Sequence, residues 1–273
     1  METSELTKQR IEELLEKGKR LDDRGINDFR DLEIEFEISN KAEGSALVKL
    51  GDTQVIAGIK MGIMTPFGDS PDEGVLMVGA ELSPLASDRF EMGPPQIESI
   101  ELARIIDRGI RESHCIDMKK LCITPGEKVW CIYVDLYILN ADGNLIDAGN
   151  LAAVAALNTA VFPKLDEENK ILFGEFTKER FPMKSMPITV TSYKIDSKFL
   201  IDPVQQEEDC AKARVSVNMV FGEEEYIHAM QKAGVEALTE EQIVEVMEES
   251  SKQGRKLYNA VQAIVNKYNG SKK

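Results

Sequence analysis

The chain has 273 residues, of which 42% are hydrophobic and 30% are charged; these proportions are ordinary for a globular protein and exclude wholesale disorder. Its 33 basic and 48 acidic residues leave a net charge of −15, so its overall electrostatic field repels a polyanion such as RNA. Any role in binding nucleic acid therefore requires a local group of basic side chains or a basic partner.

Cysteine and histidine, which often mark metal and redox sites, are scarce and scattered. None of the four cysteines has C-x-x-C spacing, and neither His114 nor His228 has a neighbour that would make a nucleophilic pair, so we interpret these residues and Cys115 as structural. The start of the chain lacks the apolar stretch of a signal peptide, and no apolar run approaches the roughly 18 residues of a membrane span. These features predict a soluble, cytoplasmic protein.

The first part of the chain is predicted to begin with a helix and to continue mainly as strands. Apolar residues at helical spacing follow Thr3, which we expect to cap the helix, and Gly18 is expected to end it. Apolar and acidic residues alternate over 32–38, which predicts a half-buried strand, and Gly51-Asp52 predicts the turn of a hairpin. The other predicted elements of this part are strands at 75–82 and 129–139 and helices at 97–114 and 148–161.

A charged segment that contains Pro163, Gly174 and Pro187 separates this part from a second group of strands. The last predicted helix begins at the capping box Thr239-x-x-Gln242. The predicted strands of the second part lie at 188–193, 199–201 and 215–221. We therefore divide the chain into an N-terminal helix and connection (1–30), a first half (31–162), a linker (163–187) and a second half with the C-terminal helix (188–270).

The order of these elements predicts the fold class. Strands occur in groups, and helices lie between the groups rather than after every strand. This order favours an α+β fold, in which two mixed halves of sheet and helix pack as layers, over a doubly wound parallel sheet.

Three arginines on one predicted helix are the most informative polar pattern. Arg104, Arg108 and Arg111 lie at positions i, i+4 and i+7, so they fall within a narrow arc, and Leu102 and Ile106 lie on the opposite side. Guanidinium groups at this spacing can bind successive phosphates. An ordinary solvent-exposed helix face gives the same pattern, and the residues alone leave both interpretations open.

Two other segments could bind charged groups. Asp202, Glu207, Glu208 and Asp209 follow a predicted strand and could hold Mg²⁺, although an ordinary polar loop has the same composition. The turn at 140–147 precedes a helix and could offer backbone N–H groups to an anion, but its aspartates would repel one. For both segments we favour the structural interpretation.

Several short stretches occur together in a specific order. They are residues 20–24 with Arg30, 43–46 with 50–60, 101–108, and 134–136 with 140–144. They resemble, respectively, the arginine-rich opening, the hairpin, the following helix and the Asp-Gly turn of the RNase PH family. The resemblance extends over roughly residues 20 to 265, and it implies an RNase PH-like fold.

Departures from the catalytic pattern of that family resemble its non-catalytic branch in archaeal exosome rings. Catalytic members carry a Gly-Ser/Thr-Arg phosphate-binding stretch after the Asp-Gly turn, whereas here Asn144 and Leu145 follow Gly143. Catalytic members also place an essential aspartate about six residues after an acidic pair, and the same count from Asp209 arrives at Val215. Loss of both groups would remove the main sources of transition-state stabilisation. The resemblance thus implies no catalytic, cofactor-binding or metal-binding residue in this chain.

The resemblance also implies partners. The chain would alternate with a catalytic RNase PH-like subunit in a hexamer of three heterodimers, to which RNA-binding cap subunits attach. Phosphate, and Mg²⁺ if it is used, would bind at the partner's site. Arg104 and Arg108 match positions that contact the backbone of single-stranded RNA, and Arg111 lies one turn further. Neither DNA nor a membrane is expected as a partner.

Two alternatives stay open at this point. The chain could be an active RNase PH-type exoribonuclease with an atypical site, in which Asp202, Glu208 and Asp209 hold Mg²⁺. It could also be a relative with an unrelated role, such as a small-molecule kinase. The kinase alternative is disfavoured because the sequence has no Gly/Ser-rich phosphate loop.

Overall fold

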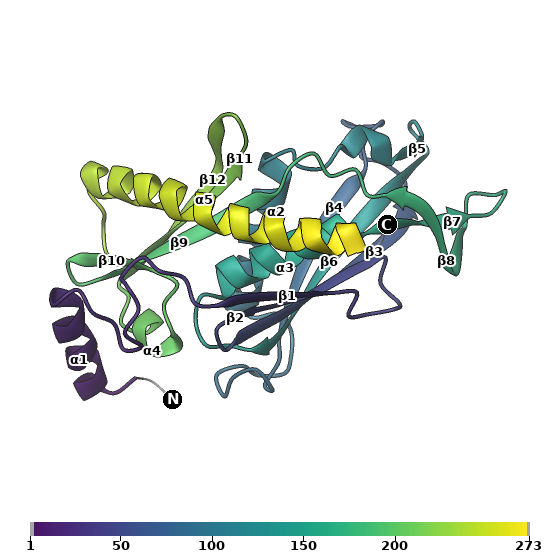
Figure 1. Cartoon of the computed structure of the whole chain (residues 1–273). Coiled ribbons are helices and arrows are strands. Elements are labelled where there is room, and N and C mark those ends of the chain that lie inside the picture. Colours follow the sequence, from purple (N-terminus) through teal and green to yellow (C-terminus); the bar gives the residue numbers. More distant parts are fainter. Residues whose placement is uncertain (1–2, 272–273) are drawn as a thin grey trace.

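Two β-sheets enclose the helix α3 in the structure, a computed structural model that describes residues 3–271 (Figure 1). Residues 1 and 2, which begin the predicted segment 1–30, lie outside the described residues. The first sheet has the strand order β1-β2-β3-β6-β4, and short β5 also pairs with β6. Its strands are β1 (Leu32–Phe36), β2 (Gly44–Leu50), β3 (Thr53–Met64), β4 (Val75–Leu82), β5 (Cys122–Thr124) and β6 (Lys128–Asn140).

The connections of the first sheet follow the sequence-based expectations. The hairpin of β2 and β3 turns at Gly51-Asp52, because Leu50 pairs with Thr53. Helix α2 (Ile97–Glu112) and the 3₁₀ helix η1 (Met118–Leu121) lie between β4 and β6, and these two strands are parallel, unlike the other pairs of the sheet. The sheet is therefore mixed, as predicted.

The second sheet is antiparallel and has the order β10-β9-β11-β12. Its elements, with the short helix α4 between β10 and β11, are β9 (Pro187–Ile195), β10 (Lys198–Ile201), α4 (Gln205–Glu208), β11 (Ala213–Phe221) and β12 (Glu225–Gly234). Strand β12 was not predicted. It is an edge strand with mostly exposed side chains, so it shows little of the apolar alternation that marks a half-buried strand.

The segment predicted as a linker contains a hairpin instead. Strands β7 (Val161–Leu165) and β8 (Ile171–Arg180) pair with each other as a separate two-stranded sheet. In Figure 1 this hairpin extends away from the rest of the chain. Most side chains of β8 are exposed, so charged residues occupy both of its faces and its sequence resembles that of a polar linker.

Helix α3 (Leu145–Thr159) begins three residues before the predicted helix at 148–161 and has two different faces. Its buried alanines pack on the first sheet together with the apolar face of α2. Its other side meets β9 through polar contacts: the Thr191 N–H donates to Asp147 at 3.0 Å, and the Thr189 N–H donates to Asn150 at 3.0 Å. The second sheet therefore turns a polar face toward α3, and its apolar face packs under α5.

The terminal helices α1 (Glu5–Glu16) and α5 (Glu240–Ser271) begin with side-chain caps. The cap of α1 is Ser4, whose Oγ accepts from the Thr7 N–H at 3.2 Å; the predicted cap Thr3 instead donates to Asp209. The capping box at Thr239 and Gln242 is confirmed by reciprocal hydrogen bonds of 3.0 and 3.3 Å.

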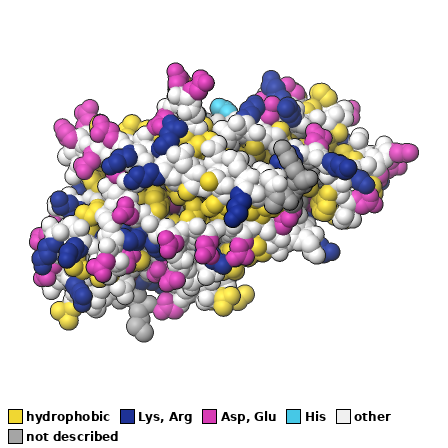
Figure 2. All heavy atoms as spheres, viewed as in Figure 1, with side chains coloured by type: hydrophobic (Ala, Val, Ile, Leu, Met, Phe, Trp, Pro, Cys, Tyr) yellow, Lys and Arg dark blue, Asp and Glu magenta, His cyan; other side chains and the backbone are white. Residues whose placement is uncertain are grey.

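Helix α5 runs across the second sheet and continues to the edge of the first sheet (Figure 1). There Tyr268 packs on Phe36 with 4.4 Å between ring centroids. Figure 2 shows acidic and basic side chains interspersed over this face, with apolar atoms along the flank of α5. Within residues 3–271, no helix is both long and apolar enough to cross a membrane.

Candidate functional site

The arginines of α2 lie on its outer side, as predicted. Leu102, Ile105, Ile106 and Ile110 are buried in the core, and this leaves the predicted basic arc exposed. All of Arg104, Arg108 and Arg111 are exposed to solvent. The helix therefore presents a row of guanidinium groups on a rigid element.

The three arginines differ in how far their own chain already binds them. Arg104 has no hydrogen bond or ion pair with any residue of the described range 3–271. Arg108 pairs with Glu112 at 3.0 Å, an exposed i,i+4 pair that contributes little. Arg111 donates to both carboxylate oxygens of Asp107, at 2.6 and 3.1 Å, and to the Leu76 carbonyl at 3.0 Å. Arg104 and Arg108 are thus available to an anion, whereas Arg111 is held by the fold.

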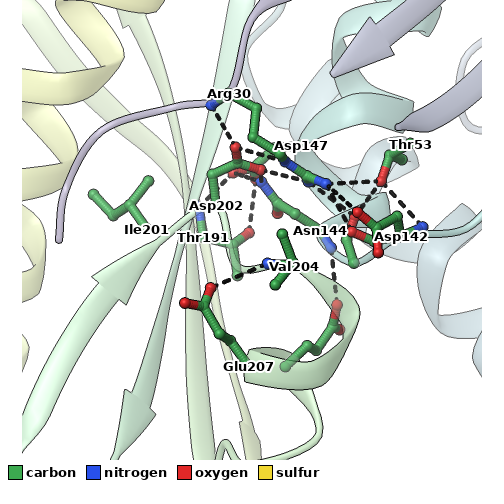
Figure 3. Close-up of polar contacts among 12 residues, drawn as sticks. Arg30, Thr53, Asp142, Asn144, Asp147, Thr191, Ile201, Asp202, Val204 and Glu207 are labelled. Atoms are coloured by element: carbon green, nitrogen blue, oxygen red, sulfur yellow. Dashed lines mark hydrogen bonds and ion pairs between the residues drawn. The ribbon is translucent and has the colours of Figure 1, made fainter. Parts of the chain in front are cut away.

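Asp202, one of the acids proposed as a magnesium ligand, lies at the centre of a buried ionic network (Figure 3). Arg30 donates to its carboxylate from the backbone N–H at 2.7 Å and from two guanidinium nitrogens at 3.0 and 2.7 Å. Arg24 adds a contact of 3.2 Å and Asn144 one of 2.9 Å. These donors occupy the hydrogen-bond acceptor sites of the carboxylate. They also connect the 19–30 segment to the second half of the chain.

Glu207 is engaged in the same way. Its carboxylate accepts from Arg20 in a pair whose two side chains are both 0% exposed. Arg20 also donates to the carbonyls of Ile201 and Asp202, both at 2.8 Å. The arginine-rich opening that resembles the RNase PH family therefore has a structural role here: it neutralises the buried acids.

Glu208 and Asp209 complete the predicted acidic group. Burial acts to raise the pKa of Asp209, but hydrogen bonds from Arg89, Thr3 and Gln205 lower it to about 2. Glu208 accepts from the Asn144 N–H at 2.8 Å, and burial raises its pKa. Nowhere in residues 3–271 do three His, Cys, Asp or Glu side chains converge as a metal site would require. Each of the four acids is thus held by donors of the chain itself, and Asn144 donates to both Asp202 and Glu208.

The turn at 140–147, the other candidate anion site, is closed by the chain itself. The Asn144 N–H at the start of α3 already donates to Glu208, and the next residues, Leu145 and Ile146, have apolar side chains. Asp147, one of the aspartates expected to repel an anion at this turn, has a buried side chain that accepts from Thr191. The carboxylate that occupies this helix N-terminus is therefore that of Glu208.

The turn depends on Gly143. Its φ is +81°, in the left-handed region, and a Cβ at this position would lie 2.5 Å from the Pro203 carbonyl oxygen. We expect Gly143→Ala to lower the free energy of unfolding by about 2–3 kcal/mol, through backbone strain and the clash together. Urea unfolding measures the loss.

The matched control is Gly126→Ala. Gly126 has a similar φ of +76°, but no atom lies within 4 Å of its added Cβ. For Gly126→Ala we expect a loss of unfolding free energy of about 1 kcal/mol, which comes from backbone strain alone. Equal losses in the two variants would contradict the close approach of the 203–205 backbone to the turn.

Asp147 gives the fold a pH dependence. Burial raises its pKa from 3.8 to about 7, and the nearby charge of Asp202 adds to this, although hydrogen bonds from Thr191 and Asn144 oppose it. The folded state thus holds a proton that the unfolded chain releases near pH 3.8. The stabilisation of the folded state that comes from this proton is complete below pH 3.8 and is lost as the pH rises to about 7.

Asn at this position imitates the protonated acid. We expect Asp147→Asn to gain stability over the wild type progressively between pH 4 and pH 7, with a constant difference above that range. Thermal unfolding across this pH range measures the difference. Exposed Glu167→Gln serves as the control, and a difference for Asp147→Asn that does not change with pH would contradict a buried proton.

A pocket of about 820 Å³ opens beside the start of α3. Two arginines line it, and each already faces a carboxylate of the same chain: Arg214 pairs with Glu101 at 2.6 Å and Arg89 with Asp209 at 2.6 Å. The pocket therefore offers no unpaired guanidinium to a phosphate. Sequence patterns did not reveal Arg89, because it lies in a loop without periodicity and its partner is 120 residues away.

The isolated histidines and cysteine do not form a reactive pair. Cys115 is fully buried, and burial raises the pKa of its thiol to about 11, which disfavours the nucleophilic thiolate. The adjacent His114 is exposed, and His228 lies on the edge strand β12. This arrangement agrees with the structural role predicted for them.

Comparison with known proteins matches two family models to the chain. Residues 28–163 match the 3′ exoribonuclease family, domain 1, and residues 185–253 match domain 2 of the same family. Two similar relatives are exosome complex components Rrp42. The one from Methanosarcina acetivorans is 48% identical over 89% of this chain and 88% of its own length, and the one from Archaeoglobus fulgidus is 44% identical over 89% and 91%.

Solved structures agree with this assignment. A chain of the Archaeoglobus fulgidus exosome with RNA bound to the active site superposes with a TM-score of 0.85 at 41% identity, covering 93% of this chain and 97% of that one. A chain of an archaeal exosome core gives 0.82 at 38% identity, covering 94% and 96%. The α+β, RNase PH-like fold predicted from the sequence is thereby confirmed, and the chain belongs to the 3′ exoribonuclease family of RNase PH-like proteins.

Proposed function

We propose that this chain is a non-catalytic ring subunit of a 3′→5′ phosphorolytic exoribonuclease complex, an exosome. It shapes the active site of a catalytic neighbour and contacts the RNA backbone through Arg104 and Arg108. The similarity to Rrp42 components over most of the chain supports the assignment to an exosome. The geometry around α3 supports the non-catalytic role.

The observation that carries the proposal is the closed N-terminus of α3. Phosphorolysis requires a place for inorganic phosphate, and a helix N-terminus with free N–H groups is a natural one. Here the Asn144 N–H donates to the half-buried Glu208 carboxylate, and Leu145 supplies neither a hydroxyl nor a charge. A phosphate at this position would meet a carboxylate in a region of low dielectric, where like charges repel strongly.

The acidic residues that would assist phosphorolysis are also paired with arginines of the same chain. Asp202 and Glu207 pair with the buried Arg20 and Arg30 and with the half-buried Arg24, and Asp209 is paired with Arg89. Val215, at the position of the expected catalytic aspartate, is a buried core residue of β11. This geometry disfavours the alternative of an active enzyme that uses Asp202, Glu208 and Asp209 with Mg²⁺.

RNA contact is proposed for the two arginines that the fold leaves available. Backbone contacts of this kind position a strand without reading its sequence. These contacts are compatible with the net charge of −15. A few guanidinium groups that line a ring create a local positive field, and this field can attract RNA although the chain as a whole is acidic. We do not include Arg111 among the RNA-binding residues, because Asp107 and the Leu76 carbonyl hold its guanidinium.

The proposed assembly is a hexamer of three heterodimers with a catalytic RNase PH-like subunit, to which RNA-binding caps attach and through which single-stranded RNA passes. Phosphate, and Mg²⁺ if it is used, then belong to the partner's site, and this chain needs no cofactor. We place the complex in the cytoplasm, in keeping with the scattered free thiols.

The absence of a phosphate site can be tested on the isolated chain. We expect its melting temperature to be the same in millimolar phosphate as in sulfate of equal ionic strength, which controls for general salt stabilisation. The catalytic partner, treated identically, should be stabilised specifically by phosphate. A saturable, phosphate-specific rise for this chain would contradict the proposal.

A further inference from the structure

Within residues 3–271, one face of the first sheet is left exposed along the second half of β6, whereas Val129 and Cys131 at the start of this strand are buried on the same side. Residues of β6 alternate between the two faces: Val134 and Leu136 point into the core beneath α3, whereas Tyr133, Asp135 and Tyr137 point outward. The two tyrosines are 38% and 45% exposed, which is unusual for aromatic side chains in the middle of a sheet. We call this outward side the open face.

A trough crosses the open face at Asp135. In the strand register Asp135 lies between Gly58 of β3 and Gly79 of β4, so neither neighbouring strand contributes a side chain there. A Cβ on Gly58 would have no atom within 4 Å, which shows that the space above it is empty. Side chains two residues away in each direction, among them Tyr133 and Tyr137, form the walls, each about 7 Å from Asp135 along the strand.

The walls of the trough combine apolar and charged side chains. Tyr133 lies between the exposed Met77 and Lys60, whose ammonium group is already paired with Glu43, and Tyr137 lies between Glu81 and the half-buried Ile56. The trough continues into a hollow of about 500 Å³ between β4 and α2, which Gly79, Asp135 and Tyr137 help to line. Its shape is therefore that of a slot for an extended side chain, with a carboxylate at the bottom.

The Asp135 carboxylate has no partner of its own. Among residues 3–271 it makes neither a hydrogen bond nor an ion pair, although it is half-buried. The hollow is also lined by Glu81, by the cation Arg104 and by Asp107, whose charge is already paired with Arg111. A half-buried, unpaired carboxylate costs free energy unless a cation approaches it, so this face is complementary to a positive group.

RNA does not fit the trough itself, because its phosphates would be repelled by Asp135 and Glu81; Arg104, the proposed RNA contact, belongs to α2 and lines the adjoining hollow. A protein surface does fit, because the exposed Tyr133, Tyr137 and Met77 favour burial against a partner. The Asp135 carboxylate between the tyrosines favours a guanidinium, which can bind a carboxylate with two hydrogen bonds and stack on an aromatic ring. We propose that the open face docks a neighbouring ring subunit, and that an arginine of that subunit enters the trough onto Asp135. This inference rests on the proposed ring assembly.

Association with a catalytic RNase PH-like subunit, measured by sedimentation or mass photometry across a concentration series, tests the inference. Asp135→Asn removes the charge, and we expect it to weaken association at least tenfold. Gly58→Val fills the trough with a residue that suits a strand and has room for its Cβ, and we expect a similar loss with an unchanged melting temperature. Glu35→Gln, an exposed acid on β1 of the same sheet, should change association less than twofold.

The outcomes separate this inference from the proposed function. If the wild-type chain does not associate with the catalytic subunit, both are overturned. If it associates and the Asp135→Asn and Gly58→Val variants bind equally well, the ring assignment stands and the docking inference fails. Stronger RNA binding by Asp135→Asn, with association unchanged, would assign the open face to RNA and would also overturn the inference.

Discussion

Replacing Asp202 with asparagine is expected to lower the free energy of unfolding of the isolated chain by about 3–5 kcal/mol. The Asp202 side chain is 0% exposed, and its charge is matched by Arg24 and Arg30. Asparagine keeps the size and tolerates the left-handed backbone at this position, where φ is 52°, so the change isolates the charge. The buried Arg30 and the half-buried Arg24 then lose their buried counter-ion, and each keeps only a partly exposed carboxylate, Asp142 and Asp22 respectively. Urea unfolding measures the loss.

An exposed ion pair provides the control for Asp202→Asn. Glu33 lies 3.7 Å from Lys49 with 70% of its side chain exposed, and Glu33→Gln should cost no more than about 0.5 kcal/mol. If Asp202→Asn also costs less than about 1 kcal/mol, the network in Figure 3 does not hold the N-terminal connection to the second half as described.

The second large effect is expected in RNA binding by the reconstituted ring. We expect Arg104→Ala combined with Arg108→Ala to weaken binding of a single-stranded oligonucleotide by about ten- to a hundredfold, because each substitution removes a charge-assisted hydrogen bond to a phosphate. The slope of log K against log salt should fall by about 0.7 for each phosphate that is no longer neutralised. Fluorescence anisotropy over a salt series measures both, and mass photometry confirms that the ring is intact.

Arg111→Ala is the matched control on the same helix. It removes the same charge one turn away, but Arg111 is already held by Asp107 and the Leu76 carbonyl. A change of less than about threefold is expected, with the salt slope nearly constant. If Arg111→Ala weakens RNA binding as much as the substitutions of Arg104 and Arg108 do, the hydrogen bonds that hold Arg111 do not keep it from RNA, and the proposed difference between the arginines is wrong. No change in any variant would remove α2 from the RNA path.

Local patterns in the sequence were sufficient for much of the fold. The spacing of Leu102, Ile106 and Ile110 placed the buried side of α2 and hence the exposed arc of arginines. The turn at Gly51-Asp52 and the capping box at Thr239 were also correct, because these structures depend on residues only a few positions apart. Strands β8 and β12 were missed for the converse reason: their exposed, polar side chains leave no periodic signal.

The partners of the acidic residues could not be predicted. Arg30 and Asp202 are 172 positions apart in the sequence. Only the folded chain shows that this acid, proposed as a ligand of Mg²⁺, is paired with an arginine instead. Arg111 illustrates both cases. Its i−4 partner Asp107 is visible in the sequence, whereas the Leu76 carbonyl that also holds it comes from another strand.

The proposed function assigns the chemistry to a partner and a supporting role to this chain. The decisive measurement is the phosphate-dependent release of nucleoside diphosphates from a poly(A) strand, with this chain titrated into a fixed amount of a catalytic RNase PH-like subunit. We expect no release by the chain alone, and a rate in the mixture that rises and saturates near equimolar amounts. Release by the chain alone, abolished by Glu208→Gln in a folded protein, would contradict the proposed function and would place an active site in the acidic group.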